Sequence, residues 1–598
     1  MTGTDSGIVV NVAVDSAVDG AKPGAELREG DTAHFTLTFK DQASGKPLRG
    51  AYPNAWLGLR PEGQTLDRRS CTAQVATFTS GGLFSRPALD LNIYYVLALN
   101  SDGTITVVDP HFSFGGSQLL AMLQLEAHGY DWALGNDETK LFVTMPSIGK
   151  VAVIDTTLWK LIKTIEVGPD PRRVVAQPDG RMVWIASTDG ASAVRASDQS
   201  VAVKIATGKG LHDITTTPDS RYAIVTNRDD GTASIIDTST LKEVARGPVS
   251  EKPVSVAFSP LSQNVYVAGE SGTITVIDLR QRKAVAHIDT EAGLSAARVT
   301  PDGRYLFTLN PGKELMHIID VSSNRVIQTG ELEGEPFEVT FTDNLAYVRR
   351  KASEVVLMVP LADIGREGKQ ITVVDFPAGA EVFGKMPRTV AADGITSAPG
   401  EEAVLVANPA DHEVYYYREG MAAPVGHFSN YGHSPEAVLV VDRSLKESKP
   451  GTYTSAVSLP AAGSYNVAVF VNSPRVVMCF PLTIAENPSL PPKKGRMPVN
   501  IEQLTDKRVL PVGEKAKLTF RLTDAKTNAP ANGLADARAF IMQASGSWSE
   551  RLALTARADG HYETDFTSPQ PGVYYVWVEC PSIGLKVSNP EFLVLESE

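Results

Sequence analysis

One repeating pattern of apolar and polar positions dominates the middle of the chain. Each unit starts at a polar turn, often Asp-Gly, and continues with a short apolar strand, a second strand that ends in aspartate, and a third. Two clear copies read DGRMVWIASTDGASAVRASDQSVAVKIAT from Asp179 and DGRYLFTLNPGKELMHIIDVSSNRVIQTGEL from Asp302. Further copies begin at Asp137, Asp219 and Leu261. Neighbouring copies lie about 41 residues apart, the spacing of four-stranded units.

Looser copies of the same unit begin at Ile93, Asp343 and Glu401. They bring the total to eight, and seven stays open because the last two are irregular. A single unit cannot bury both of its apolar faces, so the units must stack around a ring. The pattern therefore predicts an all-β fold built on an eight-bladed, alternatively seven-bladed, β-propeller over residues 75–430.

A second repeat pairs the C-terminal region with two separated segments. The sequence GEKAKLTFRLTDAKTNAPANG of residues 513–533 is similar to GDTAHFTLTFKDQASGKPLRG of residues 30–50. Likewise DGHYETDFTSPQPGVYYVWVECPS of residues 559–582 is similar to PGTYTSAVSLPAAGSYNVAVFVNS of residues 450–473. The C-terminal region thus contains both motifs in one continuous segment, whereas in the rest of the chain the two motifs lie on either side of the propeller units.

The second repeat predicts a β-sandwich split by the propeller. Its halves are expected at residues 8–65 and 435–487, because an insertion is tolerated where the two ends of a loop lie close together. A second, uninterrupted sandwich is expected at residues 499–598. The Pro-rich segment AENPSLPPKKGRMP of residues 485–498 is the linker between the sandwiches.

Three resemblances to known families follow from these motifs. The blade units resemble YVTN-type β-propeller repeats over roughly residues 90–428, and also the eight-bladed haem-d-binding domain of cytochrome cd-type nitrite reductases. The half-motif TFxLTDxxTxxPxxG resembles bacterial immunoglobulin-like modules, which implies an immunoglobulin-like sandwich. Such modules occur on secreted and periplasmic proteins, so this resemblance implies a periplasmic or extracellular location.

Composition narrows the function classes. The net charge of −13 and a pI of about 5.4 disfavour nucleic-acid binding, which needs a basic face. No apolar stretch approaches the roughly 18 residues of a membrane span. The first residues, MTGTDSG, form no signal peptide. We therefore expect a leader that has been removed from an extracytoplasmic protein, with a cytoplasmic protein as the alternative.

The most distinctive candidate for a cofactor site is His212. The segment GLHDITTTPDSRYAIVTNRDDGTASIID of residues 210–237 resembles the haem-d-binding segment of the cd-type enzymes, in which a histidine ligates the iron. The resemblance implies that His212 is a proximal haem ligand, with Tyr130 and Arg172 beside it. The alternative is a channel histidine without a cofactor. Tyr130, Arg172 and His212 occupy equivalent positions in their repeat units, six places before the Pro-Asp turn or its counterpart and at the entry to the innermost strand, here called the register position. In other units the register position is occupied by Val254, Ser295, Pro336 and Asp393.

Other residues suggest metal binding or a disulfide. His111, His128 and Asp131 flank an unusually long loop and could hold a transition metal at one mouth of the propeller. The alternative is a loop that only packs. The three cysteines are too few for a disulfide scaffold. Cys71 and Cys479 flank the propeller, so they could form a disulfide, remain free thiols, or provide a copper corner with Met478.

No catalytic motif of the hydrolases, zinc proteases or nucleotide-binding enzymes is present. We therefore expect a non-catalytic extracytoplasmic protein whose propeller binds a protein or a ligand. The first alternative is a redox accessory protein that holds haem d or a metal through His212 and binds a cytochrome or another redox protein. The second alternative is a self-associating subunit of a surface layer or fibre.

Overall fold

The computed structural model describes most of the 598 residues. The described residues are 1–16, 24–60, 67–79, 87–110, 118–351, 353–365, 371–380, 390–399, 402–488, 499–505, 509–524, 527, 529–543, 548–583, 585 and 593–597. They form two compact units, Met1–Glu486 and Asn487–Glu598. No helix among them is long and apolar enough to cross a lipid bilayer.

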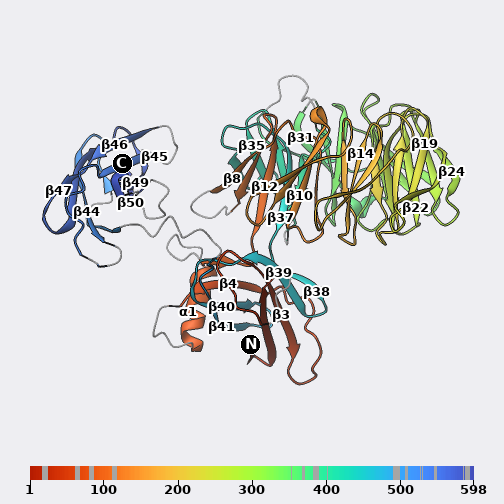
Figure 1. Ribbon diagram of the computed structural model, residues 1–598. Coiled ribbons are helices and arrows are strands. Elements are labelled where there is room, and N and C mark those ends of the chain that lie inside the picture. Colours follow the sequence, from red (N-terminus) through yellow and green to blue (C-terminus); the bar gives the residue numbers. More distant parts are fainter. Residues whose placement is uncertain are drawn as a thin grey trace. The chain divides into compact units, whose positions relative to one another are not determined.

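Eight four-stranded antiparallel sheets follow one another through the described part of residues 94–442, and each is one blade of a β-propeller (Figure 1). Their strands, blade by blade, are β37 (Pro435–Asp442), β6 (Tyr94–Asn100), β7 (Thr104–Asp109) and β8 (Gln118–Gln124); β9 (Trp132–Leu134), β10 (Lys140–Met145), β11 (Lys150–Asp155) and β12 (Lys160–Glu166); β13 (Arg173–Ala176), β14 (Met182–Ser187), β15 (Gly190–Arg195) and β16 (Val201–Ile205); β17 (Ile214–Thr216), β18 (Tyr222–Asn227), β19 (Thr232–Asp237) and β20 (Lys242–Pro248); β21 (Pro253–Ser259), β22 (Asn264–Gly269), β23 (Thr273–Asp278) and β24 (Lys283–Asp289); β25 (Ala296–Val299), β26 (Tyr305–Asn310), β27 (Leu315–Asp320) and β28 (Arg325–Glu331); β29 (Pro336–Phe341), β30 (Leu345–Arg350), β31 (Ser353–Pro360) and β32 (Val374–Pro377); β33 (Ile395–Ser397), β34 (Ala403–Asn408), β35 (Glu413–Arg418) and β36 (Gly426–Ser429).

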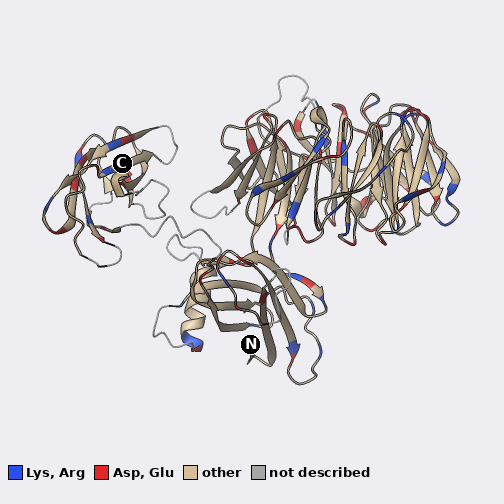
Figure 2. Ribbon diagram, viewed as in Figure 1, with Lys and Arg blue, Asp and Glu red and all other residues tan. Residues whose placement is uncertain are grey.

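The burial of each strand explains the sequence pattern of the blades. Strand β10 is apolar at consecutive positions because it packs against neighbouring blades on both of its faces. Strand β20, at the outer edge of its blade, alternates between exposed and half-buried residues because one of its faces meets solvent. Charged residues of both signs are interspersed over the strands and turns (Figure 2).

The ring closes through a strand that lies beyond the predicted end of the propeller. Strand β37 pairs with β6, from Pro435 opposite Asn100 to Asp442 opposite Tyr94. The prediction that assigned residues 435–442 to the sandwich is therefore corrected. An apolar strand of this kind suits a propeller or a sandwich equally, and only its pairing partner decides between them.

The first sandwich is built from segments on both sides of the propeller. Its core contains buried residues from both of its sheets, including Phe35 and Val467. Strand β3 pairs with β39 and strand β4 with β40, so the chain leaves this sandwich and returns to it. The sheets are β1 (Thr2–Asp5), β2 (Ile8–Ser16), β3 (Thr32–Asp41), β39 (Thr452–Ser458) and β38 (Lys446–Lys449); and β41 (Val476–Ile484), β40 (Gly463–Val471), β4 (Asn54–Leu59) and β5 (Leu89–Asp90).

The C-terminal unit is a second sandwich with its own core, which includes Phe520 and Val576. Its sheets are β42 (Val499–Gln503), β44 (Lys515–Asp524), β48 (His561–Thr567) and β47 (Thr555–Ala556); and β43 (Val509–Leu510), β50 (Leu593–Ser597), β49 (Gly572–Glu579), β45 (Arg538–Gln543) and β46 (Ser549–Ala553). Apart from short edge strands, the order of strands in both sheets is that of the first sandwich. The same tyrosine bond also recurs: Tyr465 donates to the carbonyl of Ala461, and Tyr574 donates to that of Gln570.

The one α-helix in the described residues, α1 (Arg68–Thr79), lies between the first sandwich and the propeller in sequence. Asp67 caps it, because its carboxylate accepts the backbone N–H of Ser70 at 2.7 Å while the Ser70 hydroxyl accepts the N–H of Asp67 at 3.2 Å. The helix packs on β40 and β41 of the first sandwich. Residues 75–79 therefore belong to this helix, and the predicted start of the propeller at residue 75 is corrected to β6. Short 3₁₀ turns occur at Pro146–Ile148, Leu361–Asp363, Ala558–Gly560 and Pro581–Ile583.

Candidate functional site

The entries of the innermost strands surround a cavity of about 310 Å³, here called the mouth cavity. Tyr130, Arg172 and His212 all line it, so the structure brings together the three residues predicted for a cofactor site. Three further register positions, Val254, Ser295 and Asp393, line it as well. At the remaining position Phe337, and not Pro336, lines the cavity.

Arg172 is held in place by two neighbours. Its guanidinium lies 5.1 Å from the centre of the Tyr130 ring, a cation–π distance, and its Nε lies 2.8 Å from Oδ2 of Asp170. The hydrogen bond to Asp170 raises the pKa of Arg172 above its ordinary value. Arg172 is therefore a fixed cation with a partly exposed side chain at the rim of the cavity.

His212 is buried, and its ring orientation is set by the backbone. Nδ1 lies 2.5 Å from the carbonyl oxygen of Thr226, so it donates its proton to that oxygen. Burial lowers the pKa of His212, with the backbone contacts of Thr226 and Thr188 acting in the opposite direction. The imidazole is therefore neutral near pH 7, with its remaining lone pair on Nε2.

A haem iron bound to His212 would need an open coordination position at Nε2. Nε2 is instead fully buried, and it has no hydrogen bond of ordinary geometry. The ring also lies against the backbone of Thr188, in the hairpin turn of the neighbouring blade. The residues as arranged here do not fit a haem held by His212, although the position of this histidine at the mouth agrees with the prediction.

A belt of ion pairs crosses the channel beneath the mouth cavity. Nε of Arg173 lies 2.8 Å from Oδ1 of Asp213, and its Nη1 lies 3.4 Å from Oδ2 of Asp131. Each aspartate also accepts a backbone N–H from the next blade, Asp131 from Val174 and Asp213 from Val256, both at 2.9 Å. Burial by itself would lower the pKa of Arg173, but the two carboxylates raise it above the ordinary value.

Arg298 and Asp393 form the second part of the belt. Nη2 of Arg298 donates to Oδ1 of Asp393 at 2.9 Å and to Oδ2 at 3.2 Å. A second cavity, also of about 310 Å³, lies on the other side, and it shares Arg173, Asp213, Arg298 and Asp393 with the mouth cavity. The belt therefore divides the channel into two chambers.

The predicted metal set does not come together. His111 lies outside the described residues. Nε2 of His128 lies 2.6 Å from Oε2 of Glu436, which raises the pKa of His128, while Asp131 belongs to the belt. Among the described residues, no group of three or more His, Cys, Asp or Glu side chains is arranged to hold a metal ion.

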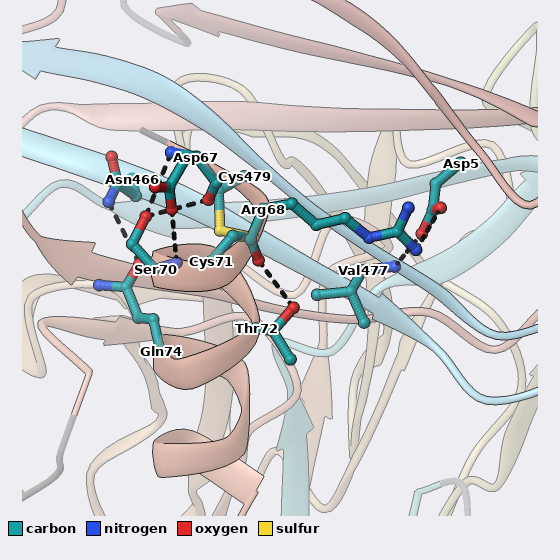
Figure 3. Close-up of a disulfide and its surroundings, with 10 residues drawn as sticks. All are labelled: Asp5, Asp67, Arg68, Ser70, Cys71, Thr72, Gln74, Asn466, Val477 and Cys479. Carbon is teal, nitrogen blue, oxygen red and sulfur yellow. Dashed lines mark hydrogen bonds and ion pairs between the residues drawn. A yellow bond between two sulfur atoms is a disulfide. The ribbon is translucent and has the colours of Figure 1, made fainter. Parts of the chain in front are cut away.

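Cys71 and Cys479 form a disulfide that joins helix α1 to strand β41 across 408 residues of sequence (Figure 3). Arg68, at the start of the helix, forms an ion pair of 2.9 Å with Asp5, whose other oxygen accepts the N–H of Val477. Of the three alternatives for these cysteines, the structure shows the bridge. The Cys479 sulfur is therefore not a free thiolate for copper beside Met478.

Sequence reasoning missed Arg173, Asp213, Arg228 and Arg298. Arg173 and Asp213 could have been identified from the sequence, because each directly follows a residue at a register position, Arg172 or His212. Arg228 comes from a turn and Arg298 from the interior of β25, so no fixed offset in the repeat identifies them. Their convergence depends on how the blades are placed around the axis.

Comparison with known proteins assigns the chain to no family. No protein-family model matches the chain, and no curated protein matches it either. Among solved structures, the chain is similar to dihydro-heme d1 dehydrogenase NirN in complex with DHE, at 16% identity and a TM-score of 0.49, covering 64% of this chain and 89% of that one. It is also similar to apo AztD from Citrobacter koseri, at 12% identity and a TM-score of 0.46, covering 58% and 98%.

Proposed function

We propose that the chain is a non-catalytic binding protein of an extracytoplasmic compartment, and that its mouth cavity holds a small ligand with carboxylate groups. The observation that carries this proposal is that three guanidiniums, besides that of Arg173 in the belt, converge from three different blades on one cavity of about 310 Å³. They belong to Arg172, Arg228 and Arg298. A cavity of this size suits a small organic molecule.

Each guanidinium is held by a carboxylate and keeps donors for a ligand. The partners are Asp170 for Arg172, Glu270 for Arg228 and Asp393 for Arg298, at 2.7–2.9 Å. A guanidinium carries five N–H donors, and each of these pairs uses only part of them. The side chains are 28–43% exposed, so the remaining donors are accessible. Because the donors are already oriented, a ligand loses less entropy on binding.

The polar groups of the cavity favour binding over catalysis. The Ser295 hydroxyl donates to the carbonyl of Leu309 at 3.3 Å, and Nδ1 of His212 is bonded to the carbonyl of Thr226. An activated nucleophile needs a hydroxyl or thiol within hydrogen-bonding reach of a base. Here the hydroxyl and the imidazole are each directed at backbone oxygen instead.

The Cys71–Cys479 disulfide supports the extracytoplasmic part of the proposal. Stable disulfides form in oxidising compartments and are rare in the cytosol.

Calorimetric titration of the full-length protein with citrate tests the ligand class. We expect citrate to bind and the dication putrescine not to bind. Arg298→Gln should weaken citrate binding at least tenfold. Arg246→Gln is the matched control, because Arg246 pairs with Glu243 on the outer strand β20, away from the cavity. Equal affinity in the two variants, or no heat from citrate with the wild type, would refute the proposal.

A further inference from the structure

A second basic site lies between the β17–β20 and β21–β24 blades, in a cavity of about 420 Å³ here called the interblade groove. Arg221 and Tyr222 from the first blade line it, with Phe258, Arg280 and Arg282 from the second. It shares no residue with the mouth cavity. The groove opens at the turns that precede β18 and β24, whereas the mouth cavity lies at the entries of the innermost strands.

Tyr222 organises the cations of the groove. Its ring is 5% exposed, and the guanidinium of Arg221 lies 5.1 Å from the ring centre. The guanidinium of Arg282 lies 5.7 Å from the same centre, and its Nη2 donates to the Tyr222 hydroxyl at 3.2 Å. Two like charges are therefore fixed around one aromatic ring, an arrangement that repulsion opposes unless an anion lies nearby.

The described carboxylates near these cations are too few to neutralise all three guanidiniums: Asp219 lines the groove and Asp278 pairs with Arg280. Arg221 and Arg282 form no ion pair with any described carboxylate, and Arg280 reaches only Asp278, at 3.7 Å. The Asp219 carboxylate contributes one negative charge to the groove, and its Oδ1 accepts the Thr217 hydroxyl and the backbone N–H of Arg221 rather than a guanidinium. Each guanidinium of the mouth cavity, by contrast, has a carboxylate partner.

Apolar surface lies beside the guanidiniums. Phe258 is half-buried in the lining, Leu279 forms a buried wall, and Leu261, next to the lining residue Pro260, is 59% exposed. An inorganic oxyanion would use only the charges. A peptide with acidic and apolar side chains would use the charges and the apolar wall together, and arginine and aromatic residues are enriched in protein interfaces for this reason.

We propose that the interblade groove docks an acidic segment of a partner protein, with carboxylates on Arg221, Arg280 and Arg282 and an apolar side chain against Phe258. The guanidinium fork matches a carboxylate through two parallel N–H···O bonds, which gives the contact both strength and direction. This inference does not depend on the ligand proposed for the mouth cavity, since the two sites share no residue.

Fluorescence anisotropy with the full-length protein provides the test. The probes are a labelled, end-blocked peptide Glu-Leu-Glu-Glu-Leu-Glu, its counterpart with glutamine for glutamate, and a counterpart with serine for leucine. We expect the acidic peptide to bind, and both counterparts to bind at least tenfold more weakly. The double variant Arg221→Gln/Arg282→Gln should lose at least tenfold in affinity for the acidic peptide.

The control variant is Arg304→Gln combined with Arg246→Gln, which removes the same total charge. Arg304 lies 5.0 Å from the centre of the Tyr305 ring, so it repeats the cation–π contact of the groove in a different blade. This control should bind the peptide like the wild type. The proposal is overturned if both double variants lose the same affinity, if the wild type does not bind the acidic peptide, or if inorganic phosphate competes as well as the peptide does.

Discussion

Arg173 lies 2.8 Å from Asp213, and this contact joins the entries of the innermost strands β13 and β17 inside the channel. Because Arg173 also pairs with Asp131, one guanidinium links three consecutive blades. The propeller is thus held together at its axis by charge as well as by the apolar packing between blades.

Replacing Arg173 with methionine leaves two carboxylates unpaired in the channel. We expect the free energy of unfolding to fall by about 3 kcal/mol, the lower end of the range for breaking a buried ion pair, because Arg173 keeps some solvent contact. Denaturant unfolding followed by circular dichroism measures the loss. Arg181→Met is the control, since Arg181 is exposed and lies 3.7 Å from Asp179. A loss as small as that of the control would contradict this account of the belt.

Removing the disulfide should destabilise the first sandwich. For Cys71→Ala/Cys479→Ala we expect a loss of about 2–4 kcal/mol, because the bridge restricts the unfolded chain. Reductant should lower the unfolding midpoint of the wild type and leave that of the variant unchanged. Cys580→Ala should retain the sensitivity to reductant, since Cys580 is a buried free cysteine. Insensitivity of the wild type would show that the bridge does not form in solution.

His212 should make the protein less stable in acid. The pKa of His212 in the folded state is below the ordinary 6.5. Its contribution to the free energy of unfolding is therefore complete above pH 6.5, and it is lost as the pH falls through the folded-state pKa. His212→Asn keeps an N–H donor for Thr226 but cannot be protonated. We expect this variant to lose less stability than the wild type between pH 7.5 and pH 5 in thermal unfolding.

The pKa of His128 is shifted in the opposite direction to that of His212, so its effect on stability has the opposite pH dependence. Its pKa is raised by the hydrogen bond to Glu436, so its contribution is complete below pH 6.5 and is lost as the pH rises through the folded-state pKa. His128→Gln should therefore cost stability at pH 5.5 and little at pH 9. The same pH slope in both histidine variants would refute these assignments.

Gly394 leaves room for a buried ion pair. A Cβ at this position would lie 1.6 Å from Nη1 of Arg349, which is 3.5 Å from Oε2 of Glu338. Gly394→Ala should displace the guanidinium and lower the free energy of unfolding by about 1–3 kcal/mol. Gly247→Ala is the control, because a Cβ there meets no atom within 4 Å, and it should change stability by less than about 0.5 kcal/mol. Equal stability of the two variants would contradict the prediction.

The repeat spacing predicted the blades, because one period of four strands is a property of the sequence itself. The register also placed Tyr130, Arg172 and His212 at one cavity, since equivalent positions in a ring of blades face one axis. The pair of His128 and Glu436 could not be predicted from the sequence, because the two residues are 308 positions apart and meet only when β37 closes the ring. The burial of Nε2 of His212 could not be predicted from the sequence either, because it depends on a turn of the neighbouring blade.

The disulfide between Cys71 and Cys479 has a mechanical consequence. Tension applied between the two ends of the chain passes from the segment before Cys71 directly through the sulfurs to the segment after Cys479. The residues between the two cysteines, whose sequence separation is 408, contain every described propeller strand and lie outside that load path. A pulling force can therefore stretch the flanking segments of the chain while the propeller carries no load, as long as the bridge is oxidised.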